Sequence, residues 1–321
     1  MALWAGIDEA GYGPRLGPLV VACSAFNVPG RPKEDHLWHA LDDAVTRDIR
    51  KADGRVLVDD SKLVYNPSRG IRRLEEGVLA FAHCLGVRPV RAEEFLSAVL
   101  HPASPMTDGA PWFQDVGSVR LPLESNASAL ASKAALLAAA MPQRGVKFVD
   151  AHLAVVLPTE YNRFVEQTHN KSFLLFQKCG LLLQRLWRMS EGQEAFVLVD
   201  KHGGRMRYRK LLRDVFPRCA CDVVREDEEG SVYKLGDSDR TLFVAFKEGA
   251  DSKGFPTALA SMFAKYVREV YMHAFNAYWL GQMAGLKPTA GYARDAGRFL
   301  RDIAPLLKRD GVEMNALVRR S

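Results

Sequence analysis

Apolar runs of strand length alternate along the chain with amphipathic stretches of helical length. Residues 3–7 and 18–26 are short and apolar, and the glycines and prolines between them predict two strands joined by a turn. Residues 56–64 predict a third strand, and apolar side chains at helical spacing over 67–86 predict a helix after it. Residues 100–124 show no period and are rich in Pro, Gly and Asp, which predicts an irregular excursion.

The second half of the chain continues this alternation. Residues 171–189, opened by Asn170 as a cap, predict a helix so apolar that it is buried. Residues 195–200 form a continuous apolar strand that ends in an acid and is typical of a sheet covered on both faces. Further strands are predicted at 221–226, 231–236 and 240–248, and further helices at 128–141, 205–216, 256–280 and 293–307. The pattern predicts a layered α/β domain.

Composition narrows the class of protein. The 321 residues are 48% hydrophobic, which suffices for one large domain or for one domain with an insertion. The net charge of +6 is compatible with a polyanionic partner, and a merely basic soluble protein is an equally good interpretation. Five scattered cysteines without CxxC spacing indicate neither disulfides nor zinc. We therefore expect a cytoplasmic protein, without a membrane segment.

The stretch GIDEAGYGPRLGPLV places two acids, Asp8 and Glu9, directly before three glycines. It is not a dinucleotide fingerprint, because the third glycine falls one residue late and a strand follows instead of a helix. A Walker loop is excluded, since no Gly-Lys-Ser/Thr follows, and a plain turn is the structural alternative. A divalent cation would reconcile the acids with the glycines, because it attracts a phosphate that glycine lets the backbone approach.

Two further acids stand where such a site needs them. Asp200 ends the apolar strand at 195–200, and Asp251 lies between a predicted strand and the long predicted helix. Taken singly, each acid has an even chance of being a helix cap or a turn residue. Together with Asp8 and Glu9, they favour a two-metal phosphoryl-transfer site with Mg²⁺ or Mn²⁺.

The motif around Asp8 and Glu9, with several later stretches, resembles a known family, ribonuclease HII, the type 2 ribonuclease H. GIDEAGYGPRLGPLVVA is similar to its opening Asp-Glu motif, DDSKLV (59–64) to its Asp-Ser-Lys-Lys-Leu, and VLVDKHG to its strand ending in Ile-Asp-Gly. KEGADSKGFPTALASMFAKYVRE resembles its Lys-Gly-Asp segment and the helix that follows. PTAGYARDA resembles its Lys-Gly-Tyr-Pro-Thr. The matched landmarks cover about half of the chain.

The resemblance implies a ribonuclease H-like fold, a mixed sheet flanked by helices. It implies that Asp8, Glu9, Asp200 and Asp251 are catalytic and bind metal, with Lys62 near the substrate phosphate. The implied activity is metal-dependent cleavage of the RNA strand of RNA/DNA hybrids, or of ribonucleotides embedded in DNA, leaving a 3′-hydroxyl. The partner is then such a duplex; protein partners are unknown, and we expect a monomer.

Departures from the family pattern bear on substrate contacts. The family Gly-Arg-Gly is here Gly11-Tyr12-Gly13, and Tyr12 cannot supply the charge or the bidentate fork of an arginine. Lys201 and His202 follow Asp200 where the family has Gly-Asn; they are candidate substrate contacts, and two polar loop residues are an equal alternative. Tyr292 matches a tyrosine that packs on the deoxyribose, or it is a core tyrosine.

The chain is about 100 residues longer than a typical family member, judged against the usual size of one domain. We predict one domain over 1–321, with a first insertion over 95–165 and a second over 203–240. The basic stretch RMRYRKLLR suits a nucleic-acid backbone, although a solvated surface helix is the commoner meaning of such a run. Two alternatives to the ribonuclease remain: a nuclease whose substrate has shifted to DNA or structured RNA, and a catalytically silent nucleic-acid-binding protein.

Overall fold

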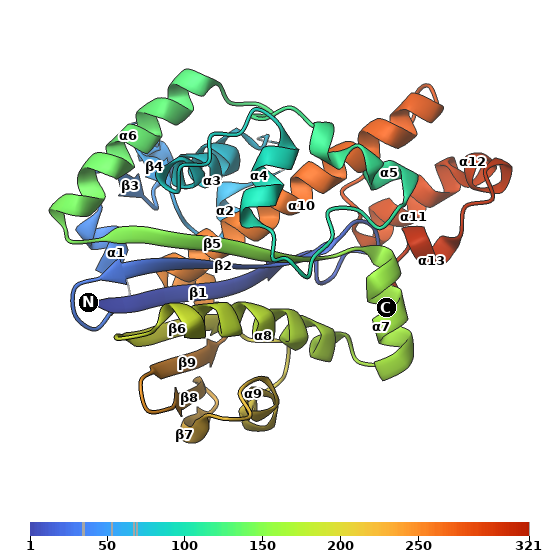
Figure 1. The fold of residues 1–321 in the computed structure, drawn as a ribbon. Helices are drawn as coiled ribbons and strands as arrows, with labels where there is room; N and C mark the ends of the chain where they lie inside the picture. The colour runs from blue at the N-terminus through green and yellow to red at the C-terminus, as the bar shows by residue number, and fades with distance from the viewer. Residues whose placement is uncertain (34–35, 53, 67, 69, 321) are drawn as a thin grey trace.

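A computed structural model describes residues 1–33, 36–52, 54–66, 68 and 70–320 of the chain. Within these residues a seven-stranded sheet runs through the molecule in the order β5-β2-β1-β6-β9-β8-β7 (Figure 1). Its strands are β1 (Ala2–Ala10), β2 (Leu19–Val28), β5 (Lys147–Val156), β6 (Glu194–Asp200), β7 (Ala220–Asp227), β8 (Gly230–Gly236) and β9 (Thr241–Lys247). A separate two-stranded sheet pairs β3 (Val45–Thr46) with β4 (Val56–Leu57).

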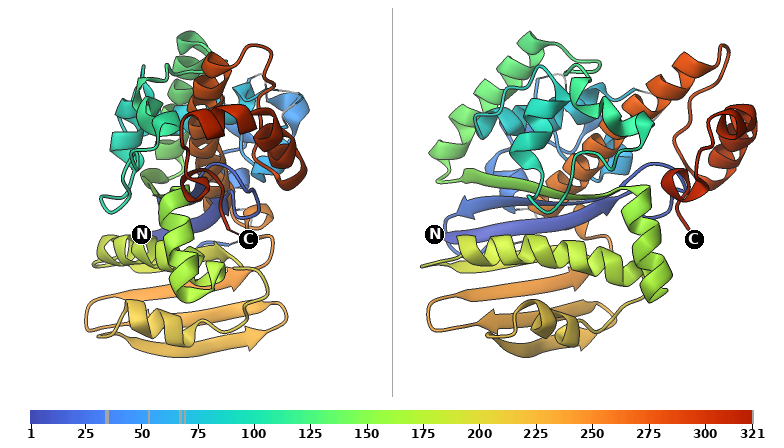
Figure 2. Two further views of the ribbon diagram at one scale, coloured as in Figure 1. Left: turned by 90° about the vertical axis from the view of Figure 1, so that its right-hand side faces the viewer. Right: turned by 45° about the vertical axis from the view of Figure 1, so that its right-hand side comes forward.

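Helices pack against both faces of the main sheet. The helices of the described residues are α1 (His36–Ala40), α2 (Ser61–Val64), α3 (Arg72–Cys84), α4 (Ala92–Val99), α5 (Pro111–Gln114), α6 (Ala127–Gln143), α7 (Pro158–Thr168), α8 (Lys171–Met189), α9 (Arg209–Val215), α10 (Phe255–Gln282), α11 (Ala293–Asp302), α12 (Ala304–Arg309) and α13 (Met314–Leu317). Short 3-10 helices are η1 (Ile49–Lys51), η3 (Val116–Ser118) and η4 (Ala250–Ser252). Helices α3, α6 and α10 lie on one side of the sheet, and α8 and α9 lie on the other (Figures 1 and 2). The mixed sheet flanked by helices that the resemblance implies is confirmed.

The directions of the strands bring the carboxyl ends of three of them to the same end of the sheet. β1 runs antiparallel to β2 but parallel to β6, and β6 runs parallel to β9. The carboxyl ends of β1, β6 and β9 therefore lie side by side. Residues that directly follow or end these strands are brought together, although almost 200 positions separate the first two in sequence.

The amino end of α10 lies directly on β1, and a glycine makes this possible. A Cβ on Gly6 would lie 2.1 Å from the backbone nitrogen of Thr257, so only glycine allows this close approach. The side chain of Thr257 in turn donates a hydrogen bond to the carbonyl oxygen of Leu198 on β6, at 3.1 Å. Helix α10 is thus fixed against the two strands that carry Asp8 and Asp200.

Most predicted elements are confirmed, and the exceptions have physical reasons. The strand predicted over 56–64 is wrong beyond Leu57, because Asp60 accepts a hydrogen bond from the backbone N–H of Lys62 and starts helix α2 instead. The prediction that 195–200 is covered on both faces is wrong for one face. Phe196 and Leu198 are half-buried there, since α10 covers β1 and β2 and contacts β6 mainly near its end.

Two further elements differ from prediction. The predicted basic helix over 205–216 is helical only from Arg209 to Val215. Residues 147–156, inside the predicted insertion over 95–165, form β5 and pair with β2 as a strand of the main sheet. The segment 203–240 contains α9, β7 and β8. In the part of the chain that the structure describes, none of the helices has the length and apolarity needed to cross a bilayer.

A candidate metal centre at the strand ends

Asp8 and Asp200 lie next to each other on neighbouring parallel strands. The register pairs Ile7 with Val199, so the next residue on each strand is one of the two acids. Asp8 is 7% exposed, and its Oδ1 accepts a hydrogen bond from the backbone N–H of Glu9 at 2.8 Å. The sheet geometry therefore holds one carboxylate on β1 against another on β6, as the sequence predicts.

Glu9 completes a group of three carboxylates. Asp8, Glu9 and Asp200 each offer one oxygen atom, and these atoms lie within 4.8 Å of one another. Carboxylate oxygens are the donors that Mg²⁺ and Mn²⁺ prefer, and a few of them with waters suffice for such an ion. The donor set at the ends of β1 and β6 fits a divalent cation.

Asp251 lines the same cavity from η4 but is not one of the closest three. The carboxylate of Asp200 accepts a hydrogen bond from the backbone N–H of Ala250 at 2.9 Å, which ties this turn to the end of β6. The Asp251 carboxylate accepts one from the backbone N–H of Ser252, also at 2.9 Å. The fourth predicted acid is therefore held at the wall of the cavity beside the other three.

The four acids perturb one another because they share one partly desolvated space. Burial, with the charges of Glu9 and Asp200 added, raises the pKa of Asp8 well above its ordinary value. Burial and the charge of Asp200 raise the pKa of Glu9 to about 8, and burial followed by the charge of Asp60 raises that of Asp251 to about 6. Such a concentration of negative charge is stabilised by a cation and is disfavoured without one.

This arrangement predicts how the metal-free protein responds to pH. Glu9 and Asp251 have pKa values of about 8 and about 6 in the folded chain, above 4.5 and 3.8 for the ordinary groups. At a pH between its ordinary and its raised pKa, each of these carboxyls is protonated in the folded state and ionised in the unfolded state. The free energy of unfolding therefore falls as pH rises from 5 to 8, by up to about 1.4 kcal/mol per pH unit for each proton that the folded state holds in excess. Thermal melts in EDTA should show this fall.

Mg²⁺ or Mn²⁺ should counteract the loss, since an ion that binds only the folded state at about 100 times its dissociation constant adds about 2.7 kcal/mol. Glu9→Gln should flatten the pH dependence in EDTA. Equal melting temperatures with and without metal at pH 8 would count against a metal site.

The other predicted substrate contacts lie around the acids. A cavity of about 710 Å³ is lined by the four carboxylates and by Gly11, Tyr12, Gly13, Lys62 and Tyr292. Lys62 is exposed on α2, and although burial alone lowers its pKa, the nearby carboxylates Asp60 and Asp251 raise it overall. Tyr292 is 50% exposed at the start of α11, so it is not a core tyrosine.

Lys201 and His202 are not brought to this cavity. His202 is 2% exposed and lies among the rings of Phe176, Tyr208 and Phe246. Burial lowers its pKa to about 3, so it stays neutral. Lys201 is half-buried, and its backbone N–H donates to the carbonyl oxygen of Lys247 at 3.0 Å. The substrate contacts predicted for these two residues find no support in this arrangement.

The cavity also has a wall that the sequence analysis did not identify. The Tyr65 hydroxyl donates a hydrogen bond to Glu269 at 3.1 Å, and the Lys265 ammonium lies 2.6 Å from the same carboxylate. The ammonium also lies 4.7 Å from the centre of the Tyr65 ring. Lys265 falls within the matched segment KEGADSKGFPTALASMFAKYVRE, which was a usable signal, but no sequence signal marks Tyr65.

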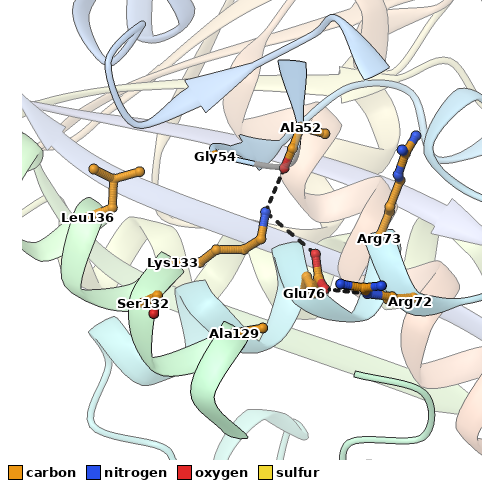
Figure 3. Close-up of a pocket in the computed structure, with 9 residues that line it drawn as sticks. All are labelled: Ala52, Gly54, Arg72, Arg73, Glu76, Ala129, Ser132, Lys133 and Leu136. Carbon is orange, nitrogen blue, oxygen red and sulfur yellow. Dashed lines mark hydrogen bonds and ion pairs between the residues drawn. The ribbon is translucent and has the colours of Figure 1, made fainter. Parts of the chain in front are cut away.

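A second cavity, of about 590 Å³, lies between α3 and α6 (Figure 3). Three of its charged side chains, Lys133, Glu76 and Arg72, bind one another or the backbone. Lys133 donates to the carbonyl oxygen of Ala52 at 2.8 Å and lies 3.5 Å from Glu76, which pairs with Arg72. These contacts join two helices to the loop before β4, so they stabilise the fold and leave the strand-end cavity as the candidate site.

Comparisons with known proteins gave structural matches but no sequence family. No protein-family profile and no curated protein matches the chain. A chain of the PCNA:RNase HII complex from Archaeoglobus fulgidus is 16% identical, with a TM-score of 0.45 over 99% of this chain and 93% of that one. Ribonuclease H2 from Pyrococcus horikoshii OT3 is 14% identical, with a TM-score of 0.46 over 98% and 92%. Bst-RNase HIII in complex with Mn²⁺ is 15% identical, with a TM-score of 0.44 over 99% and 66%.

Proposed function

We propose that this protein is a metal-dependent endoribonuclease that cleaves the RNA strand of RNA/DNA hybrids, or ribonucleotides embedded in DNA, and leaves a 3′-hydroxyl. The observation that carries the proposal is the trio Asp8, Glu9 and Asp200, whose carboxylate oxygens lie within 4.8 Å of one another at the ends of two parallel strands. Asp251 lies beside the trio in the same cavity. The motifs that resemble ribonuclease HII carry these same four acids.

In this proposal Asp8, Glu9, Asp200 and Asp251 hold Mg²⁺ or Mn²⁺. The chemistry that a divalent cation supplies in such a site is Lewis-acid stabilisation of charge on phosphodiester oxygens during in-line displacement. The exposed ammonium of Lys62 attracts the substrate phosphate to the carboxylates, which would otherwise repel it. The half-exposed ring of Tyr292 offers a face on which a sugar can pack.

Tyr12 is the residue on which substrate choice depends. It lines the cavity, and the ammonium of Lys171 lies 5.2 Å from the centre of its ring. A positive charge therefore stands near the position of the family arginine, although on a different residue. We infer that Lys171 and Tyr12 together hold the backbone near the ribonucleotide, whose 2′-hydroxyl distinguishes RNA from DNA. A cytoplasmic location belongs to the same proposal, and the five unpaired cysteines fit a reducing compartment.

Cleavage of four labelled duplexes tests this function. The duplexes are an RNA/DNA hybrid, DNA with one embedded ribonucleotide, all-RNA and all-DNA, each with Mg²⁺ and separately with Mn²⁺. We expect cutting of the first two only, with 3′-hydroxyl products, and none by Asp200→Asn. Cutting of all-DNA or all-RNA would instead indicate a nuclease with a shifted substrate. Binding without any cutting would indicate a catalytically silent nucleic-acid-binding protein.

A further inference from the structure

A line of positive side chains leads away from the candidate metal centre along the segment that follows Asp200. We call it the basic track; it consists of Lys171, at the start of α8, and of five residues after Asp200, namely Arg205, Arg207, Arg209, Lys210 and Arg213. Arg207, Arg209, Lys210 and Arg213 are exposed and line a cleft of about 610 Å³. Helix α9, which carries the last three, lies at the outer side of the sheet beside β7 (Figures 1 and 2).

The track is held in place by buried aromatic and apolar side chains between its charges. Tyr208 is fully buried, its ring stacks on Phe246 at 3.6 Å between centroids, and its backbone N–H donates to the Tyr233 hydroxyl at 2.8 Å. Leu212 and Phe216 follow at intervals of four and are also buried. This spacing turns the apolar face of α9 to the sheet and the cationic face to solvent. The charges are thus presented on a rigid support.

The exposed charges are poorly matched by acids of the same chain. Among the described residues, no carboxylate lies within 4.0 Å of the Arg207, Lys210 or Arg213 cationic groups. Arg209 and Arg213 stand four residues apart on α9, an arrangement of like charges that weakens an isolated helix. The cleft is also lined by Asp214 and Glu226, so four cations face two carboxylates, and Glu226 already accepts a hydrogen bond from the Tyr233 hydroxyl. An external polyanion would offset the remaining positive charge.

The near end of the track reaches the catalytic cavity through Tyr12. The Lys171 ammonium lies 5.2 Å from the centre of the Tyr12 ring, and the Arg205 guanidinium lies 3.5 Å from the Ser172 hydroxyl on the same turn of α8. Burial raises the pKa of Tyr12, and the positive charge of Arg205 acts against that rise. Lys171 and Arg205 thus place positive charge beside the cavity, and the chain continues from Arg205 through Arg207 into the cationic face of α9.

We propose that the basic track binds the phosphate backbone of a nucleic-acid duplex where it extends beyond the catalytic cavity. The proposal rests on the proposed function, since the same duplex occupies both places. Guanidinium and ammonium groups spaced along one segment suit the evenly spaced charges of a phosphate backbone. The acids Asp227, Glu228 and Glu229, where β7 turns into β8, follow the cleft residue Glu226 and disfavour phosphate there.

The test uses binding in an Asp200→Asn background, which prevents cleavage. One variant adds Arg207→Gln, Lys210→Gln and Arg213→Gln. The matched control adds Arg88→Gln, Arg91→Gln and Lys147→Gln, which removes three exposed charges on other parts of the molecule. Affinity for duplexes of about 10 and about 30 base pairs that contain one ribonucleotide is measured against salt, because each lost phosphate contact lowers the slope of log K against log salt by about 0.9.

We expect the track variant to lower this slope by about 3 on the long duplex, and by less on the short one, while the control variant keeps the parent slope. Equal slopes for track and control variants would overturn the proposal. Retained duplex affinity with lost affinity for polyglutamate would also overturn it and would indicate an acidic protein partner. If the parent binds no duplex at all, the proposed function itself fails and the track proposal fails with it.

Discussion

Asp8→Asn should reduce cleavage of the ribonucleotide-containing duplex by about a thousandfold or more. Asp8 is 7% exposed and is one of the closest three carboxylates, and it stands next to Asp200 in the register of β1 and β6. An amide has the same shape but no charge, so the variant keeps the fold and weakens the hold on a divalent cation. Losing several kcal/mol of transition-state stabilisation corresponds to roughly 10³-fold, since each 1.36 kcal/mol is a factor of ten. Single-turnover cleavage with saturating enzyme measures it.

The control for Asp8→Asn is Glu194→Gln, at the opposite end of β6. Glu194 is half-buried and pairs with the exposed Arg31, so its loss should leave the rate within about twofold, as expected for a surface ion pair. In EDTA at pH 8, Asp8→Asn should melt higher than the parent, because repulsion among the carboxylates is relieved. A variant that cleaves at the parental rate would remove Asp8 from the catalytic group.

The sequence pointed to Asp8, Glu9 and Asp200, which the structure brings together, because these acids stand at the ends of apolar runs. Residues 3–7 and 195–200 are apolar enough to predict β1 and β6, and each run is followed or ended by an acid. The adjacency of the two strands could not be predicted in this way, because it depends on a register between segments almost 200 residues apart. The resemblance to ribonuclease HII supplied that long-range information.

Strand β5 was missed because its pattern contains polar side chains. Asp150 and His152 interrupt the apolar run at 147–156, which weakens a strand prediction. In the folded chain Arg185 of α8 donates two hydrogen bonds of 2.7 Å to the Asp150 carboxylate, which makes a buried acid tolerable within a sheet. The partner is 35 residues away and on a helix, so no local pattern shows it.

The glycines of the opening motif serve a purpose that the sequence did not reveal. They were predicted to let the backbone approach a phosphate. Of the three, only Gly13 has open space at the position that a Cβ would occupy, so only there could a ligand come close. At Gly11, which has φ of +90°, a Cβ would lie 2.4 Å from the Pro18 carbonyl oxygen and 3.1 Å from the side chain of Arg268. At Gly17 a Cβ would meet Arg268 at 2.7 Å. Two of the three glycines thus make room for a buried arginine of α10.

Arg268→Met should lower the free energy of unfolding by about 3 kcal/mol or more, because it leaves buried acceptors without donors. Arg268 is 1% exposed, and its guanidinium donates hydrogen bonds to the carbonyl oxygens of Leu16 at 3.2 Å, Pro18 at 2.9 Å and Ala290 at 2.9 Å. It therefore joins the loop after Glu9 to the segment before Tyr292. Urea unfolding measures the loss, and Arg301→Met, an exposed residue of α11, should stay within about 0.5 kcal/mol of the parent.

The effect of Arg268→Met on the site should be selective. Loosening the two loops moves Tyr12 and Tyr292, so KM for the duplex should rise. Asp8 and Asp200 are held by the sheet and not by Arg268, so the rise in melting temperature on adding Mg²⁺ or Mn²⁺ should persist. Arg268→Lys should have a KM and a free energy of unfolding between those of the parent and of Arg268→Met, because one ammonium cannot reproduce the planar fork that reaches three acceptors. If Arg268→Met also abolished the rise in melting temperature with metal, Arg268 would support the carboxylates directly. If KM stayed at the parental value, the two loops would not hold the substrate.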